Sequence, residues 1–358
     1  MMAEGLRPTY ARRLDELRRA DDASFGAKSA SLGELLAAAI PVPGGFALAA
    51  EAFHTFVSDA GLQGRLAAAQ ARLSAGDLDS VSAVSRAISE AMRFAPVPEG
   101  VREQIAACYA ALAGIAGEAE PPVAVRSSAL GEDSQEATFA GQQESYLWVR
   151  GLEHVCDAVR DCWVSLYSPP ALAYRARLAR APEPAMGVTV QLMVDAEVSG
   201  VMFTCSPVSG DPSMVAINAS WGLGLAVVGG EVTPDDYLIS KVTGEVVREH
   251  VHHKHVQYLP DPRGRGTVAV DVAQERRDVP CLEAAALDAL VDIARRIERH
   301  FGCHQDIEWA IARRSVLPES LFVVQSRPVT AVSRPKAGPS ADAMALVMST
   351  FGVRRGAD

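Results

Sequence analysis

The sequence predicts a mixed α/β (α+β) protein, helix-rich in its N-terminal part and built of mixed or antiparallel sheets in its C-terminal part. Alanine-rich stretches with helical period fill residues 62–117. From Gly187 onward, short alternating apolar runs are separated by glycine and proline, which is typical of strands joined by tight turns. With 358 residues, of which 49% are hydrophobic, the chain is long enough for two or three structural lobes.

Helices are expected mainly in the first half of the chain. Their predicted ranges are 10–20, 29–39, 50–60, three helices within 62–117, 151–167 and 170–180. Gly76 and the turn at Pro96 to Pro98 separate the three alanine-rich helices, because glycine and proline interrupt helices. This middle segment is interpreted as scaffold.

Strands are expected mainly in the second half. The predicted ranges are 188–193, 200–204, 214–219, 237–241, 245–251, 306–312 and 321–327. An amphipathic helix over 282–301 separates the last two strands from the others. A short strand is also expected after the stiff turn at residues 41–45.

The stretch from Val123 to Val149 is predicted to clamp phosphate. Two strand-like runs enclose a polar segment that has too few apolar residues to form a core. Arg126 offers a fork of hydrogen-bond donors to phosphate, and Gly141 permits close approach of backbone N–H groups. Lys28 lies at the start of a predicted helix, a usual place for phosphate, although a surface lysine is the simpler interpretation of that residue alone.

Two other clusters receive structural interpretations. Trp221 to Gly224 lacks the third glycine of a dinucleotide fingerprint and is interpreted as a turn at a sheet edge. His252, His253 and His255 are the densest histidine cluster, but strand alternation would place His252 on the opposite face. A joint metal site is therefore not expected there.

Two predicted strands near the chain end carry polar residues in alternation. Asp306 and Glu308 share one face of the first strand, and Gln325 and Arg327 share one face of the second. If the strands are adjacent, oxygen ligands for magnesium lie beside a guanidinium that stabilises phosphoryl charge. Taken singly, these residues also fit a cross-strand ion pair on a solvated face.

Composition excludes several classes of protein. The formal net charge of −10 disfavours nucleic acid as a partner. No apolar run approaches the ~18 residues of a membrane helix, and the charged N-terminus lacks a secretory signal, so a cytoplasmic location is expected. The six cysteines lack ligand spacing and are expected to be reduced and mostly buried.

Seven motifs together resemble the nucleotide-binding domain of phosphoenolpyruvate synthase, pyruvate phosphate dikinase and rifampicin phosphotransferase. In chain order they are FGAKSASLGE, PVPGGFAL, VAVRSSALGEDSQEATFAGQQESYLWV, SGVMFT, WGLG with VTPDDY, HFGCHQDIEWA and LFVVQSRP. The resemblance covers roughly residues 20–330 and implies a bilobed ATP-grasp unit over 1–332, with its helical insert at about 62–117. In this family the lobes close over ATP and Mg²⁺.

The resemblance also implies which residues bind ATP. Lys28 and Arg126 would bind phosphates, and Gly141 and Ser145 would line the loop over the nucleotide. Gln191 would also contact ATP.

The far end of the chain carries the implied metal site. Glu308 and Gln325 would hold magnesium, and Arg327 would contact the transferred phosphoryl group. Lys28, Arg126 and Arg327 are therefore the expected catalytic residues. The family cleaves ATP to AMP and phosphate and leaves the β-phosphoryl on a histidine.

Three positions depart from the family pattern. Ala27 replaces a glycine, Leu130 replaces a threonine hydroxyl, and Leu225 replaces an acidic residue after WGLG. The last two leave open a nucleotide-sensing module without turnover. An ADP-forming ligase is a further alternative for an ATP-grasp protein.

The phosphorylated histidine of the single-chain relatives is not expected in this sequence. None of the eight histidines lies in a Thr-Ser-His-Ala motif, and little chain follows residue 330. The chain is therefore similar to one subunit of a split enzyme, with the histidine and acceptor site on a separate partner subunit. The expected small-molecule acceptor is a phenol, as in phenylphosphate synthase, with pyruvate as the alternative. The tail at 333–358 is a candidate for binding that partner.

Overall fold

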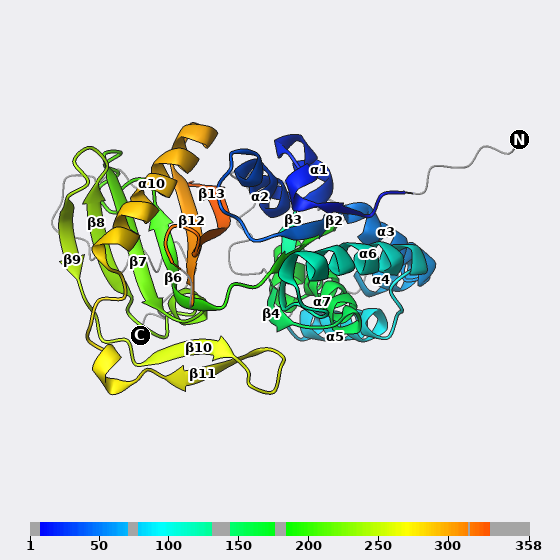
Figure 1. Cartoon of the computed structure of the whole chain (residues 1–358). Helices are drawn as coiled ribbons and strands as arrows, with labels where there is room; N and C mark the ends of the chain where they lie inside the picture. The colour runs from blue at the N-terminus through cyan, green and yellow to red at the C-terminus, as the bar shows by residue number, and fades with distance from the viewer. Residues whose placement is uncertain (1–7, 71–77, 131–143, 176–183, 314–315, 330–358) are drawn as a thin grey trace, which may run out of the picture. The chain divides into compact units, whose positions relative to one another are not determined.

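The computed structural model describes residues 8–70, 78–130, 144–175, 184–313 and 316–329 of the chain. These described residues form two compact units, the first within residues 1–33 and 44–193 and the second within residues 34–43 and 194–358. Each unit has its own antiparallel sheet (Figure 1). The prediction of a mixed α/β protein with antiparallel sheets is confirmed.

The first unit contains a five-stranded sheet in the order β1-β2-β5-β3-β4. Its strands are β1 (Ala11–Arg13), β2 (Gly45–Leu48), β3 (Val123–Ala129), β4 (Ser145–Val149) and β5 (Met186–Leu192). All pairings in this sheet are antiparallel.

Helices of the first unit surround this sheet. They are α1 (Asp22–Phe25), α2 (Ala27–Ala37, whose last turn belongs to the second unit), α3 (Ala50–Asp59), α4 (Gln63–Gln70), α5 (Leu78–Arg93), α6 (Glu99–Ala116), α7 (Leu152–Ser165) and α8 (Pro169–Arg175). A core of buried side chains joins α3, α5, α6 and α7 to the sheet, and Trp163 of α7 lies 5.0 Å from Phe56 of α3 between ring centroids. Three helices, α4 to α6, lie within the predicted alanine-rich segment.

The second unit contains a six-stranded sheet in the order β13-β12-β6-β7-β8-β9. Its strands are β6 (Ala196–Phe203), β7 (Met214–Trp221), β8 (Asp235–Ser240), β9 (Val246–His250), β12 (Gln305–Ala312) and β13 (Leu321–Pro328). A separate hairpin consists of β10 (Val256–Pro260) and β11 (Thr267–Asp271), and a short helix, α9, covers Leu225–Val228.

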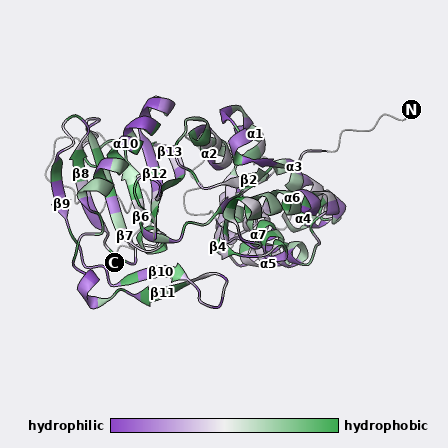
Figure 2. Ribbon diagram, viewed as in Figure 1, coloured by the Kyte–Doolittle hydropathy of each residue, from purple (hydrophilic) through white to green (hydrophobic). Residues whose placement is uncertain are grey.

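Helix α10 (Ala284–Phe301) packs against the six-stranded sheet with an apolar face that includes Leu290, Ala294 and Ile297. These residues recur at helical spacing, which is why the sequence alone predicts the helix. Figure 2 shows hydrophilic and hydrophobic residues alternating along it. Gly302 ends α10 in the left-handed conformation, and its N–H donates to the carbonyl of Glu298.

Three predictions of local structure are wrong. The helix expected over 10–20 is replaced by β1 and two short 3₁₀ helices, Leu14–Glu16 and Arg19–Asp21, because β1 pairs with β2. The β10–β11 hairpin was not predicted, since prolines and glycines dominate its turn. The histidine cluster at 252–255 lies between strands and not on one.

Within the described residues, no helix is long and apolar enough to cross a membrane.

Candidate nucleotide site

In the first unit, the start of α2 lies directly on strand β3. Gly26 precedes the helix with a φ of +82°, and a Cβ atom at this position would lie 2.2 Å from Oγ of Ser128 and 2.4 Å from its carbonyl oxygen. Gly187 on β5 approaches the carbonyl of Phe25 equally closely. Glycine at these two positions therefore allows the helix to begin in contact with the sheet.

Two hydrogen bonds fix the first turn of α2. The buried hydroxyl groups of Ser29 and Thr189 lie 2.7 Å apart, which ties the helix to β5. Lys28 Nζ donates to the carbonyl oxygen of Ser127 at 3.2 Å, which places the ammonium beside β3. The first N–H groups of a helix lack partners within the helix, so they and Lys28 together favour an anion.

The register of the sheet places Arg126 on the same face as this helix start. Arg126 lies opposite Ser145 of β4 and opposite Thr189 of β5, and Gln191 lies opposite Ala124. Opposed residues of antiparallel strands share a face. Thr189 holds α2 on this face of the sheet, so Lys28 of α2 lies over the same face. This face also carries the half-buried Arg126, the exposed Ser145 and the buried Gln191. Gly141, the remaining predicted ATP contact, falls outside the described residues.

In the second unit, β12 and β13 are adjacent, as the sequence analysis required. Asp306 lies opposite Arg327, and Glu308 lies opposite Gln325. All four side chains therefore share one face. The ladder is irregular between Glu308 and Trp309, and such bulges often lie beside functional sites.

The pair Asp306–Arg327 is a cross-strand ion pair. The Nε and Nη2 atoms of Arg327 lie 2.9 Å and 2.8 Å from Oδ2 of Asp306. Burial raises the pKa of Asp306 above its ordinary value, while the charge and hydrogen bond of Arg327 oppose that shift. The Arg327 side chain remains 41% exposed, so the ion pair leaves much of the guanidinium accessible to a ligand.

Magnesium fits this set of oxygen donors. Glu308 and Gln325 offer a carboxylate and an amide oxygen on one face, with Asp306 beside them. In the described part of the chain, no group of three or more His, Cys, Asp or Glu residues forms a complete metal cage. Mg²⁺ does not require one, because it usually takes one or two carboxylates together with phosphates and water.

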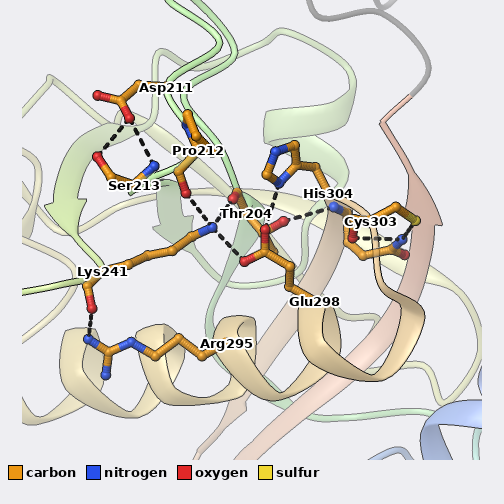
Figure 3. A network of polar contacts seen from close by, with 10 residues as sticks. Thr204, Asp211, Pro212, Ser213, Lys241, Arg295, Glu298, Cys303 and His304 are labelled. Atoms are coloured by element: carbon orange, nitrogen blue, oxygen red, sulfur yellow. Dashed lines mark hydrogen bonds and ion pairs between the residues drawn. The ribbon is translucent and has the colours of Figure 1, made fainter.

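A polar network fixes the start of β12 next to this site (Figure 3). Glu298 of α10 accepts from Lys241 Nζ at 2.5 Å through one oxygen, and lies 2.6 Å from His304 Nδ1 through the other. Lys241 Nζ also donates to the carbonyl of Thr204, whose hydroxyl accepts from the N–H of Gln305 at 2.9 Å. This network was not predicted from the sequence, because its members come from four separate segments of the chain.

The WGLG and histidine motifs support the β10–β11 hairpin. The interpretation of WGLG as a turn at a sheet edge is wrong, because Gly222 and Leu223 form bridges to Tyr258 of β10 and helix α9 follows directly at Leu225. The buried residue within the histidine cluster is Lys254. Its Nζ atom lies 2.6 Å from Oδ1 of Asp235, and the side chains of Lys254 and Asp235 are both fully buried. Their role is structural, since an ion pair without solvent access fastens the hairpin base to β8.

The six cysteines are all unpaired thiols, as predicted. Four are buried, Cys108 is half-buried and Cys303 is exposed.

Comparison with known proteins identifies the family. Residues 22–346 match the family described as the AMP/ATP-binding domain of pyruvate phosphate dikinase. The chain belongs to this family. ATP or AMP is therefore the ligand class of this domain family.

Relatives of this pyruvate phosphate dikinase domain are named phosphoenolpyruvate synthase. A probable phosphoenolpyruvate synthase of Methanothermobacter thermautotrophicus is 40% identical and one of Staphylothermus marinus 38% identical. A phosphoenolpyruvate synthase of Aeropyrum pernix is 36% identical. The alignments cover 90%, 88% and 90% of this chain but 46%, 40% and 42% of the relatives. The chain thus spans less than half the length of each of these relatives.

Among solved structures, PH1788 from Pyrococcus horikoshii covers 88% of this chain and 97% of its own, at 12% identity and a TM-score of 0.32. A similarity this low carries no argument about the fold.

Proposed function

We infer that this chain is the nucleotide-binding part of a dikinase-type phosphotransferase that uses ATP with magnesium. The observation that carries this proposal is the register of β12 and β13, which opposes Glu308 to Gln325 and Asp306 to Arg327. This arrangement offers metal ligands and a guanidinium on one face. Membership of a family described as AMP/ATP-binding supports the same ligand.

The first unit would hold phosphate oxygens. Lys28 and the N–H groups of the first turn of α2 supply positive charge and donors, and Arg126 supplies a planar pair of donors on the same face. Ser145 and Gln191 lie on that face and would contact the nucleotide. These groups position the phosphate chain, which is the main requirement of phosphoryl transfer.

The second unit would hold the reacting end of the ligand. Glu308 and Gln325 would bind magnesium, which neutralises phosphate charge when present. Arg327 would donate to the transferred phosphoryl group, and Asp306 keeps its guanidinium oriented.

The proposed reaction transfers the β-phosphoryl of ATP to a histidine nitrogen as its bond to the α-phosphate oxygen breaks, which leaves AMP, and a water molecule takes the γ-phosphoryl group to give inorganic phosphate. That histidine would lie outside these 358 residues, because none of the eight histidines has the family motif. It would be carried by a separate subunit or by a further segment of a longer protein. The partner would then pass the phosphoryl group to a small acceptor.

The names of the relatives support pyruvate as the acceptor, since phosphoenolpyruvate is its phosphorylated product. The comparisons offer no support for the phenol expected from the sequence. That acceptor stays a prediction, which depends on the arrangement as a split enzyme.

The decisive experiment compares two arginine variants. Arg327 and Arg248 lie on the same sheet face, each is paired with an aspartate, and their side chains are 41% and 40% exposed. Each variant is mixed with Mg²⁺, ATP and a separately purified histidine-bearing domain of a phosphoenolpyruvate synthase, and AMP is measured. We expect Arg327→Ala to lower the rate by about 10³-fold. Arg248→Ala should stay within about twofold of the wild type.

The nucleotide product separates the proposal from its alternatives. Formation of ADP would indicate a ligase, and tight ATP binding without turnover would indicate a sensing module. Equal loss of activity in both arginine variants would show that Arg327 has no special role in phosphoryl transfer.

A further inference from the structure

One row of residues crosses the six-stranded sheet through the proposed magnesium site. The strand registers connect, in order, Gln325, Glu308, Val201, Asn218, Asp236 and His250. Directly opposed residues of antiparallel strands point to the same face. Asn218 therefore belongs to the face that carries Glu308 and Gln325. It lies on β7, which is separated from β12 by the single strand β6 (Figure 1).

The Asn218 side chain has no hydrogen-bonding role in the described part of the fold. The residue is half-buried, and its amide forms no hydrogen bond with any residue in the described ranges. On one side its neighbour in the row is the apolar Val201. On the other side is Asp236, which already accepts from Arg248 at 3.0 Å and 3.2 Å. A polar amide in this setting is thus open to a ligand.

Asparagine is also a poor choice for this position on structural grounds. Asparagine is depleted in strands, and β7 is an interior strand of the sheet. The two residues on either side of Asn218, Ile217 and Ala219, are fully buried. The amide therefore needs an explanation other than folding.

Position explains it. Asn218 lies two strand spacings from Glu308, about 10 Å between Cα atoms, and only the short side chain of Val201 stands between them in the row. The amide Oδ1 is an oxygen donor of the kind that magnesium accepts. A magnesium–nucleotide complex held at Glu308 and extending across the sheet would meet this oxygen next.

We propose that Asn218 is a further oxygen ligand of the magnesium–ATP complex, on the side of Glu308 away from Gln325. This inference rests on the proposed function, because it takes ATP and magnesium as the ligands. The oxygen is what matters, so a carboxylate at position 218 serves equally well. Asn218→Asp retains the ligand atom, whereas Asn218→Ala removes it.

The test measures the dissociation constant of ATP by calorimetry on the full chain, once with Mg²⁺ and once with a chelator. We expect Asn218→Ala to weaken binding about tenfold with Mg²⁺ and to have no effect without it. Asn218→Asp should bind within about threefold of the wild type with Mg²⁺. His250→Ala, at the far end of the same row, is the matched control and should leave both constants unchanged. Melting temperatures verify that each variant is folded.

Two results would overturn the inference. One is equal loss in Asn218→Ala with and without Mg²⁺, which would indicate a structural role. The other is a loss in Asn218→Asp as large as in Asn218→Ala. Glu308→Gln, tested in parallel, separates this inference from the proposed function. If Glu308→Gln changes the Mg²⁺ dependence and Asn218→Ala does not, only the role of Asn218 is wrong. If the wild type binds no ATP, the proposed function fails first.

Discussion

At Asp306, opposing effects act on one carboxyl group. Burial raises the pKa above 3.8, and Arg327 lowers it through its charge and its hydrogen bond, while Glu308 raises it slightly. The raised pKa shows that burial dominates. The buried carboxylate beside Arg327 therefore serves to orient the guanidinium more than to stabilise the fold.

The pKa of Asp306 leads to a prediction about stability. Because the folded pKa lies above 3.8, the folded protein binds this proton more tightly than the unfolded chain. The group therefore stabilises the fold below the unfolded pKa, and that contribution is lost as pH rises through the raised folded pKa. Asp306→Asn removes the titration. We expect the unfolding free energy of the wild type, relative to Asp306→Asn, to fall as the pH rises from 3.8 through the raised folded pKa of Asp306. Urea unfolding across this range checks it, and a rise in that difference would contradict it.

At the scale of elements, the site depends on how closely α2 approaches β3. The approach is possible because Gly26 combines a positive φ with the absence of a Cβ atom. Helix α2 then brings Lys28 to the carbonyl of Ser127, one residue from Arg126. A local backbone feature thus decides whether two phosphate-binding residues lie together.

Two glycine variants of the first unit separate the cost of a positive φ from the cost of a steric clash with a neighbouring strand. Gly117 ends α6 with a φ of +66° and has no atom within 4 Å of an added Cβ, so Gly117→Ala measures conformational strain alone. We expect it to lower the unfolding free energy by about 1 kcal/mol. Gly26→Ala adds a steric clash with Ser128 and should cost about 3 kcal/mol or more. It should also weaken ATP binding, which Gly117→Ala should not. Urea unfolding and calorimetry check both, and equal stability of the two variants would refute the close approach.

At the scale of the whole molecule, the predicted ATP ligands are divided between two units. Lys28, Arg126, Ser145 and Gln191 belong to the first, and Glu308, Gln325 and Arg327 to the second. Each group is consistent with part of a nucleotide site by itself.

Hydrogen exchange tests whether each group of residues binds the nucleotide. ATP at 100 times its dissociation constant stabilises the binding state by about 2.7 kcal/mol. With Mg²⁺–ATP we expect slower exchange in β3 of the first unit and in β12–β13 of the second. Arg126→Ala should reduce the protection in β3. Unchanged exchange in either unit would show that its residues do not bind the nucleotide.

Elements that depend on interactions between neighbouring residues were predicted correctly from the sequence, whereas elements that depend on pairing with distant segments were not. Helix α10 and strands β12 and β13 were predicted nearly to their ends, because their hydrophobic periods are local. The alternation along the last two strands also placed Asp306 with Glu308 and Gln325 with Arg327 on shared faces. Residues 10–20 were predicted wrongly, since β1 exists only by pairing with β2, and Gln104 accepts from the N–H groups of Tyr10 and Ala11.

The sequence by itself determined the family, the local elements and the types of side chain available for binding phosphate and magnesium, because motif order and periodicity are properties of neighbouring residues. The tertiary structure alone decided which of these side chains share a face. Strand order and register are set by pairing between distant segments, so only they could place Asn218 in one row with Glu308 and reveal Lys254 as a buried partner of Asp235.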